Sequence, residues 1–168
     1  MFNFHRFEFR TIRQEEADEC AVIEQICFPP NEACTPRHMK ERIHAAPESF
    51  LVSYDKVNHR IAGFLSGICT RNDAFSDDFF TDASLHDPDG QHVMLLSLAV
   101  RPEYRHQGLA GAIIDEYLEM MTIRGKEKIV LTCHEELVSF YRDFGFEDLG
   151  FGASVWGGVR WHDMELCL

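Results

Sequence analysis

The sequence predicts one mixed α/β domain built around a single β-sheet. Apolar runs typical of strands alternate with segments of helical periodicity along all 168 residues. The order strand, helix, strand between residues 93 and 133 requires two parallel strands joined by a helix. No repeat, linker or low-complexity tract separates the chain into parts, so we expect residues 1–168 to form one domain.

The first third of the chain predicts one strand followed by two helices. Residues 7–13 alternate as in a half-buried strand, and residues 15–28 carry apolar side chains at helical spacing. Pro29-Pro30 ends that helix. Thr35-Pro36 begins a second helix, with Thr35 as N-cap and proline at the first helical position, and this helix runs to about Ala46.

The middle of the chain predicts a β-hairpin and a long acidic loop. Residues 50–54 and 61–69 read as strands joined by a polar turn at 55–59. Residues 71–91 form the acidic loop, with one helical turn at 78–81. Its carboxylates are Asp73, Asp77, Asp78, Asp82, Asp87 and Asp89. Such a loop either draws in a cationic ligand or is a solvated surface.

The last third predicts a β-α-β unit, a further helix and two closing strands. Gly145 stands where a left-handed helix cap is favoured. The expected elements are a strand at 93–100, a helix at 107–124, a strand at 128–133, a helix at 135–144, and strands at 146–153 and 159–168.

Composition narrows the choice of partners. The net charge is −12 without any block of Lys or Arg, which argues against nucleic acid and anionic membranes. Residues 1–9 alternate aromatic and polar side chains and contain no apolar stretch typical of a signal peptide or membrane span, so we expect a cytoplasmic protein, as a monomer or homodimer. No metal site is expected. Free thiols are expected at Cys20, Cys27, Cys34, Cys69, Cys133 and Cys167.

A buried strand, a tight turn and a helix with a small-residue first turn follow one another at residues 95–114. Gly108, Ala110 and Gly111 leave the first N–H groups of this helix open, and these groups carry the positive end of the helix dipole. Such a helix start can bind a pyrophosphate, with added charge from Arg105 and His106. Small residues also allow close packing of helix on sheet, so both interpretations stay open. The P-loop and dinucleotide motifs are absent.

Segment 105–110, Arg-His-Gln-Gly-Leu-Ala, resembles the R/Q-x-x-G-x-G/A motif of the GNAT acetyltransferase superfamily, and the usual strand precedes it. Segments 28–34, 131–146 and 157–164 resemble the arylalkylamine (serotonin) N-acetyltransferase branch, especially its bacterial members. Together the similar segments extend over nearly all of the chain. The resemblance implies acetyl-CoA as cosubstrate.

The resemblance also implies the GNAT version of an α/β fold. This is a mixed seven-stranded sheet flanked by about four helices, with strands 4 and 5 splayed so that pantetheine inserts between them. Backbone groups of Leu98 and Val100 would bind the pantetheine amides, and the amides of residues 105–110 would hold the pyrophosphate. The implied acetyl-CoA residues are Leu98, Ala99, Val100, Arg105, His106, Gln107, Gly108, Leu109 and Ala110.

Amine acetylation needs a free amine beside the thioester, stabilisation of the oxyanion and a proton for the CoA thiolate. Tyr141 matches the position at which the similar family places the tyrosine that protonates the thiolate, although its spacing alone indicates an aromatic core stripe. A backbone N–H near Leu96 to Leu98, exposed by a β-bulge, is the expected oxyanion donor.

The general base departs from the family pattern. The animal enzymes carry two histidines on the fourth strand, and these positions are Met94 and Leu96 here. His134 is therefore the first candidate base, followed by Glu135 and His92, or water. An acetyl-cysteine route through Cys133 is a minor alternative, because nothing in the sequence supplies an activating base.

The predicted activity is acetyl-CoA-dependent N-acetylation of the primary amine of a small cationic substrate, by direct transfer in a ternary complex. Arylalkylamines are the first expected acceptors and polyamines the second. The expected acceptor pocket is formed by residues 28–35, the acidic loop and the last two strands. The alternative is a non-catalytic acyl-CoA-binding sensor of the same fold.

Overall fold

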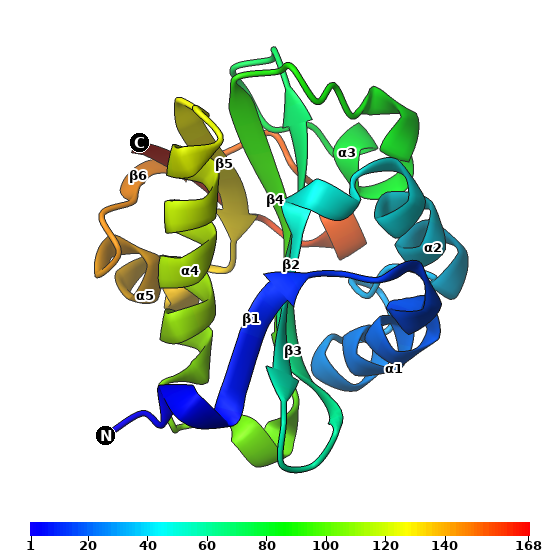
Figure 1. Cartoon of the computed structure of the whole chain (residues 1–168). Helices are drawn as coiled ribbons and strands as arrows, with labels where there is room; N and C mark the ends of the chain where they lie inside the picture. The colour runs from blue at the N-terminus through cyan, green and yellow to red at the C-terminus, as the bar shows by residue number, and fades with distance from the viewer.

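The computed structural model describes residues 1–168 and contains one seven-stranded sheet (Figure 1). The sheet order is β1-β2-β3-β4-β5-β7-β6, and β4 with β5 is its parallel pair. The mixed sheet that the sequence predicts is therefore confirmed. The strands are β1 (Phe7–Thr11), β2 (Phe50–Asp55), β3 (Arg60–Thr70), β4 (His92–Val100), β5 (Lys128–Cys133), β6 (Glu147–Phe151) and β7 (His162–Cys167).

Five α-helices cover the two faces of the sheet. In Figure 1, α1, α2 and α3 lie on one face, and α4 and α5 lie on the other. The count exceeds the expected four because the single turn predicted within the acidic loop is a short helix, α3. The helices are α1 (Ala17–Cys27), α2 (Pro36–Ala45), α3 (Asp78–Thr81), α4 (Leu109–Ile123) and α5 (Val138–Arg142).

Helix boundaries follow local chemistry. The Thr35 hydroxyl accepts a hydrogen bond from the backbone N–H of His38 at 3.1 Å, which confirms the predicted cap of α2. Gly145 has a φ of +95°, the left-handed conformation expected after α5. The single helix predicted at 135–144 was wrong in one respect: its first turn, Glu135–Leu137, is a 3-10 turn, as is common where a helix begins.

The core is divided by the sheet into layers. The largest hydrophobic cluster lies between the sheet and α4, around Ile113 and Tyr117, and a second cluster lies under α1 and α2. The acidic loop contributes a third, in which Phe75, Phe79 and Phe80 pack near Met94. The loop is thus not only a solvated surface, because its aromatic residues cover one end of the sheet.

All six cysteines are free thiols, as predicted. Within the acidic loop, Asp87 forms a salt bridge with Arg71 at 2.8 Å, so part of its charge is neutralised locally. No group of three or more His, Cys, Asp or Glu side chains is arranged to hold a metal ion. None of the helices has the length and apolar character needed to cross a membrane.

A buried carboxylate, Asp55, holds the turn between β2 and β3 beside the start of the β4–α4 connection. It accepts hydrogen bonds from Arg6 Nη2 at 2.7 Å and from the Tyr104 hydroxyl at 2.6 Å. The hydrogen bond from Arg6 lowers the pKa of Asp55 well below its ordinary value of 3.8. Because folding lowers this pKa, the carboxylate stabilises the fold fully above about pH 4 and loses its effect gradually as the pH falls from there toward the much lower pKa of the folded state.

We therefore expect Asp55→Asn to be clearly less stable than the wild type at pH 7, and the deficit to be smaller at pH 3 because the wild type has begun to lose this stabilisation. Urea unfolding of both proteins at the two pH values measures the difference. Asp18→Asn is the control, since the Asp18 side chain is 84% exposed and pairs only with Lys40. A deficit of Asp55→Asn that stays constant with pH would contradict the assignment.

Candidate active site

Strands β4 and β5 part beyond their first three paired residues. Their pairing extends from His92 opposite Lys128 to Met94 opposite Val130. From residue 95 onward β4 has no partner on its β5 side, so the predicted splay of strands 4 and 5 is confirmed. No neighbouring strand uses the backbone groups on this open edge of β4, so they can bond a ligand, except that the Val100 carbonyl already accepts hydrogen bonds from two side chains.

A β-bulge interrupts β4 at the same place. Ser66 of β3 lies opposite Ser97, and the next residue, Gly67, lies opposite Leu95. Leu96 is therefore the extra residue, which leaves its backbone outside the regular ladder. The bulge expected near Leu96 to Leu98 is confirmed, and it lies where the two strands separate.

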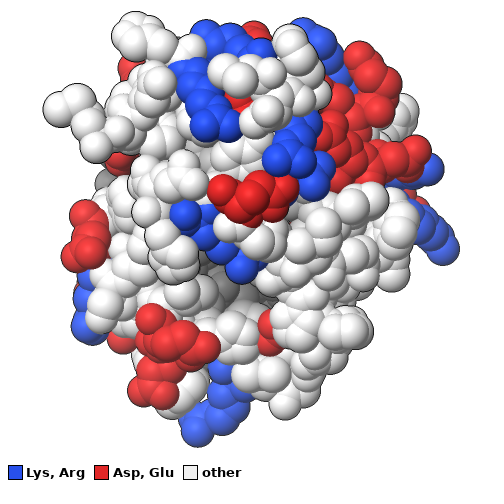
Figure 2. All heavy atoms as spheres, turned by 90° about the horizontal axis from the view of Figure 1, so that it is seen from below, with Lys and Arg blue, Asp and Glu red and all other residues white.

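A cavity of about 490 Å³ opens beside the splay. Figure 2 views the molecule from the side on which α4 begins and shows a hollow with mostly uncharged walls and basic atoms on one rim. The cavity is lined by the end of β4, the first turn of α4, the end of α1 and α5. Of the predicted acetyl-CoA residues, all but Gln107 line it: Leu98, Ala99, Val100, Arg105, His106, Gly108, Leu109 and Ala110.

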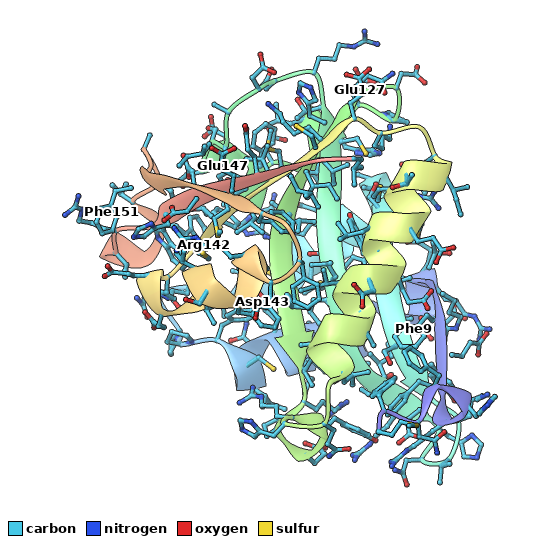
Figure 3. All side chains as sticks on the ribbon, turned by 90° about the vertical axis from the view of Figure 1, so that its left-hand side faces the viewer. Phe9, Glu127, Arg142, Asp143, Glu147 and Phe151 are labelled. Carbon is cyan, nitrogen blue, oxygen red and sulfur yellow. The ribbon has the colours of Figure 1, made fainter.

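The two interpretations of the small residues in α4 apply to different glycines. A Cβ on Gly111 would approach the Phe144 ring to 3.3 Å, so this glycine allows close packing. Figure 3 shows α5, with Arg142 and Asp143 at its end, beside the first half of α4. Gly108, by contrast, has a φ of +87°, and a Cβ added there would lie no nearer than 3.9 Å to any side-chain atom. Gly108 caps α4 next to an open cavity, where the N-terminal amides of α4 can approach an anion.

Two side chains occupy the last carbonyl of β4. Arg105 Nε donates to the carbonyl oxygen of Val100 at 3.0 Å, and Cys27 Sγ donates to the same oxygen at 3.3 Å. A pantetheine amide bound to this carbonyl would have to compete with these two donors. Arg105 is thereby held at the edge of the cavity, close to the start of α4.

Tyr141 lies on α5 and is buried in the wall of this cavity. Its ring contacts Phe140 and Phe146 edge-on, with centroids 5.1 Å and 5.7 Å away. Burial raises the pKa of Tyr141 well above its ordinary value of 10, so the phenol stays protonated at neutral pH. A protonated hydroxyl in the wall of the cavity can act as a proton donor.

A second, smaller cavity of about 40 Å³ lies on the α1–α3 side of the sheet and shares Phe28 with the first. Its walls come from residues 28–35, the acidic loop, and the segment between β6 and β7, in addition to α1, α2 and β4. Aromatic rings and carboxylates dominate it. Its lining is Glu24, Phe28, Glu32, Arg42, Phe80, Leu96, Ser97, Trp156 and Trp161.

Of the candidate bases, only His134 lies near this second cavity. His134 Nε2 is 2.7 Å from Glu32 Oε1, and its ring lies against Trp161 at a tilt of 31°, with centroids 4.2 Å apart. Glu135 is exposed at the start of the 3-10 turn. His92 bonds the carbonyl of Asn72 at the far end of β4, four residues or roughly 13 Å of strand before the bulge.

Cys133 is unsuited to a covalent route. Burial raises its pKa to about 12, so the thiol is not ionised near neutral pH. Its Sγ contacts Met164 Sδ at 3.6 Å, and no base lies within hydrogen-bonding distance. The structure therefore supplies no activated nucleophile at this position.

Three polar residues of the second cavity, and also Trp156, were not predicted from the sequence; the polar ones are Glu24, Arg42 and Ser97. Each is a polar residue at a position where the pattern calls for an apolar one. Glu24 falls on the apolar stripe of α1, Arg42 falls on that of α2 beside Ile43, and Ser97 interrupts a run of leucines in β4. Polar and charged residues are seldom buried without a specific reason, so their positions on apolar stripes could have indicated a functional site.

Comparisons with known proteins agree with the geometry. The sequence profile of the Acetyltransferase (GNAT) family matches residues 11–146. Serotonin N-acetyltransferase of Mesocricetus auratus is 27% identical over 165 residues, covering 96% of this chain and 77% of the relative. Serotonin N-acetyltransferase of Macaca mulatta is 26% identical, covering 96% of this chain and 78% of the relative. The resemblance to this branch, seen in the motifs, is confirmed.

Solved structures share the fold at lower sequence identity. A GphF GNAT-like decarboxylase in complex with isobutyryl-CoA superposes with a TM-score of 0.81 at 18% identity, over 95% of this chain and 98% of the other. Naa50 of Arabidopsis thaliana, in complex with a bisubstrate analogue, has a TM-score of 0.73 at 16% identity, over 97% of this chain and 99% of the other. With parted strands, a glycine-capped helix and a family profile that covers most of its length, this chain belongs to the acetyltransferase (GNAT) family and is an N-acetyltransferase that uses acetyl-CoA.

Proposed function

We propose that this enzyme transfers an acetyl group directly from acetyl-CoA to the primary amine of a small cationic acceptor. The observation that carries the proposal is the pair of cavities that share Phe28 at the opening between β4 and β5. One has the helix start suited to a pyrophosphate, and the other has aromatic walls and carboxylates suited to a cation. Two substrates can thus meet in a ternary complex.

On the cofactor side, acetyl-CoA supplies the acetyl group as a thioester. The open edge of β4 at Leu98, Ala99 and Val100 is the proposed site for its amide-bearing arm. The amides and side chains of residues 105–110 form the proposed anion site, where Arg105 adds a positive charge to the free N–H groups of α4. Gln107 lies outside the cavity and bonds the carbonyl of Glu103, so we assign only its backbone to this site.

On the acceptor side, the aromatic rings of Phe80, Trp156 and Trp161 line the second cavity, together with the carboxyl groups of Glu24 and Glu32. A protonated amine is attracted by both features. A flat aromatic amine fits such walls, and the relatives named serotonin N-acetyltransferase support this class. We therefore place arylalkylamines first and polyamines second.

The second cavity, which we call the acceptor cavity, must enlarge before an amine can enter. A volume of about 40 Å³ holds no more than a few water molecules. The segment 28–35 closes it, because Trp156 Nε1 donates to the Glu32 carbonyl at 2.8 Å and Asn31 Nδ2 donates to the Gly157 carbonyl at 3.0 Å. We expect this contact to open when the acceptor binds.

The chemistry then needs three roles from the chain. The backbone N–H of Leu96 at the bulge is the proposed oxyanion donor. Tyr141 is the proposed acid that protonates the departing thiolate. His134, at the edge of the acceptor cavity, is the proposed relay that carries the first amine proton to solvent.

Thiol release from acetyl-CoA, measured over a panel of amines with matched alcohols, tests the function. Activity with tryptamine or phenethylamine, and none with the corresponding alcohols, is the expected result. The sensor alternative predicts that acetyl-CoA raises the melting temperature while no amine releases thiol. Activity confined to alcohols or thiols would overturn the proposal.

The pH dependence tests the proton relay. An alkylamine has a pKa of about 10.4, so kcat/KM should climb between about pH 6 and 9 as the free base becomes accessible. His134→Ala should flatten the acidic limb of this climb and leave acetyl-CoA affinity unchanged. His44→Ala is the control, because His44 is exposed on α2. An unaltered profile in His134→Ala would remove the relay assignment.

A further inference from the structure

A buried chain of hydrogen bonds links α1, α2 and β4 behind the acceptor cavity. Ser97 Oγ donates to Glu24 Oε1 at 3.1 Å, and Arg42 Nη1 donates to Ser97 Oγ at 3.3 Å. The three residues are only 2%, 5% and 7% exposed for Glu24, Arg42 and Ser97. The chain therefore connects a carboxylate to a guanidinium through one hydroxyl, inside the protein.

The network is incompletely satisfied on the side of the cavity. Glu24 Oε2 and Arg42 Nε are buried and have no hydrogen-bond partner, and both residues line the acceptor cavity. A buried polar atom without a partner is costly unless something else bonds it. An acceptor ammonium placed against Glu24 Oε2 would meet this need.

The other contacts fix the orientation of both groups. Glu24 Oε1 also accepts from the backbone N–H of Cys34 at 3.1 Å, so this oxygen is fully engaged and Oε2 is left for the cavity. Arg42 Nη2 donates to the carbonyl of Phe80 at 2.8 Å, which holds the guanidinium in place. Arg42 forms no salt bridge with any carboxylate, so Ser97 is its route to Glu24.

We propose that Arg42, acting through Ser97, is a positioning residue that holds Glu24 as an anionic proton acceptor for the acceptor amine. The inference rests on the proposed function, amine acetylation. Ser97 immediately follows the bulge at Leu96, so the carboxylate is held next to the point where β4 and β5 separate. His134 then has the later task of passing the proton to solvent.

The proton balance is complete without another reactant. Glu24 takes one proton from the ammonium and becomes a neutral acid, which releases that proton toward His134 and solvent. The free amine forms a C–N bond with the thioester carbon, and the C–S bond breaks. Tyr141 gives a proton to the sulfur and regains one from the nitrogen, which leaves the amide and free CoA.

The charge of Arg42 acts against the cost of burying Glu24. Burial raises the pKa of Glu24, and the nearby charge of Arg42 is the largest influence that lowers it. Removing that charge should raise the pKa further and leave the carboxyl group protonated over more of the working range. The titratable or charged groups around Glu24 are Cys20 and Cys27 on α1, Glu32 and Cys34 in the following loop, and Arg42 on α2.

The test is the pH profile of kcat at saturating amine, which reports groups in the complex and not the free amine. We expect Arg42→Gln to move the acidic limb upward by about one pH unit or more. We expect kcat at pH 7 to fall by about tenfold or more. Arg42→Lys keeps the charge and should restore most of the profile. Arg37→Gln is the matched control on the same helix, since its side chain is 83% exposed.

Two further variants separate positioning from folding. Ser97→Ala should shift the limb in the same direction even if Arg42→Gln folds poorly. In a Glu24→Gln background, Arg42→Gln should cause no additional shift, because its effect passes through Glu24. An unshifted limb in folded Arg42→Gln or Ser97→Ala, or equal shifts in both backgrounds, overturns the inference. Failure of the wild type to acetylate any amine would overturn the proposed function instead.

Discussion

Tyr141→Phe is expected to lower kcat by on the order of tenfold to a thousandfold while acetyl-CoA affinity stays unchanged. The substitution removes the hydroxyl and keeps the ring. The edge-on packing of this ring against Phe140 and Phe146 is therefore preserved. Burial raises the pKa of Tyr141 well above 10, so the wild-type residue carries its proton throughout the neutral range. Loss of this hydroxyl should therefore lower kcat at every pH between about 6 and 9.

Single-turnover thiol release measures this effect directly, and isothermal titration with CoA checks binding. Tyr117→Phe is the matched control. Its hydroxyl donates to the carbonyl of Ser49 at 2.9 Å in the core, so this variant should lose stability and keep kcat. A Tyr141→Phe enzyme with wild-type kcat across the pH range would leave Tyr141 as a core residue only.

Gly108→Glu is expected to weaken acetyl-CoA binding by roughly 30-fold to 150-fold. The new carboxylate would stand at the cap of α4, beside the amides proposed to hold the pyrophosphate. Repulsion between the new carboxylate and the pyrophosphate amounts to about 2–3 kcal/mol after screening by water. Each 1.4 kcal/mol changes the affinity about tenfold. The fold has room for the side chain, since the nearest atom to a new Cβ is 3.9 Å away.

Backbone strain must be separated from charge in this experiment. Gly108 has a φ of +87°, and any side chain there costs about 1–2 kcal/mol of stability. Gly108→Gln carries the same strain without the charge and should lose much less affinity. Gly125→Glu adds the same charge at φ +72°, beyond the far end of α4, and should bind normally. Equal acetyl-CoA affinity in folded Gly108→Glu would remove the anion site from α4.

The overall negative charge of the surface supports a cationic acceptor less specifically than the second cavity does. The net charge of −12 attracts any cation. In the acidic loop, however, Asp77 is engaged by Ser154 and by the backbone N–H of Val155 at 3.1 Å, and Asp87 pairs with Arg71. The loop contributes Phe80 to the cavity wall, which is a more specific role than charge alone.

The sequence by itself determined the order of elements, the sheet class, and most of the residues that line the cavity at the start of α4. Local signals were enough for these features. Apolar periodicity defines strands and helices, Thr35 and Gly145 mark helix ends, and the motif at 105–110 lies within one strand-turn-helix unit. The part of the cavity formed by residues 98–111 could be anticipated because these residues are close together in the chain.

Only the tertiary structure decided which residues form the second cavity. Glu24, Arg42 and Ser97 come from three elements separated by up to 73 residues, and no local pattern says that they share one hydrogen-bonded chain. The same limit applies to the candidate bases: the sequence ranked His134 before Glu135 and His92 but could not show its contacts with Glu32 and Trp161 near the cavity. Periodicity indicates which face of an element is buried, whereas the contacts across that face depend on how the elements pack together.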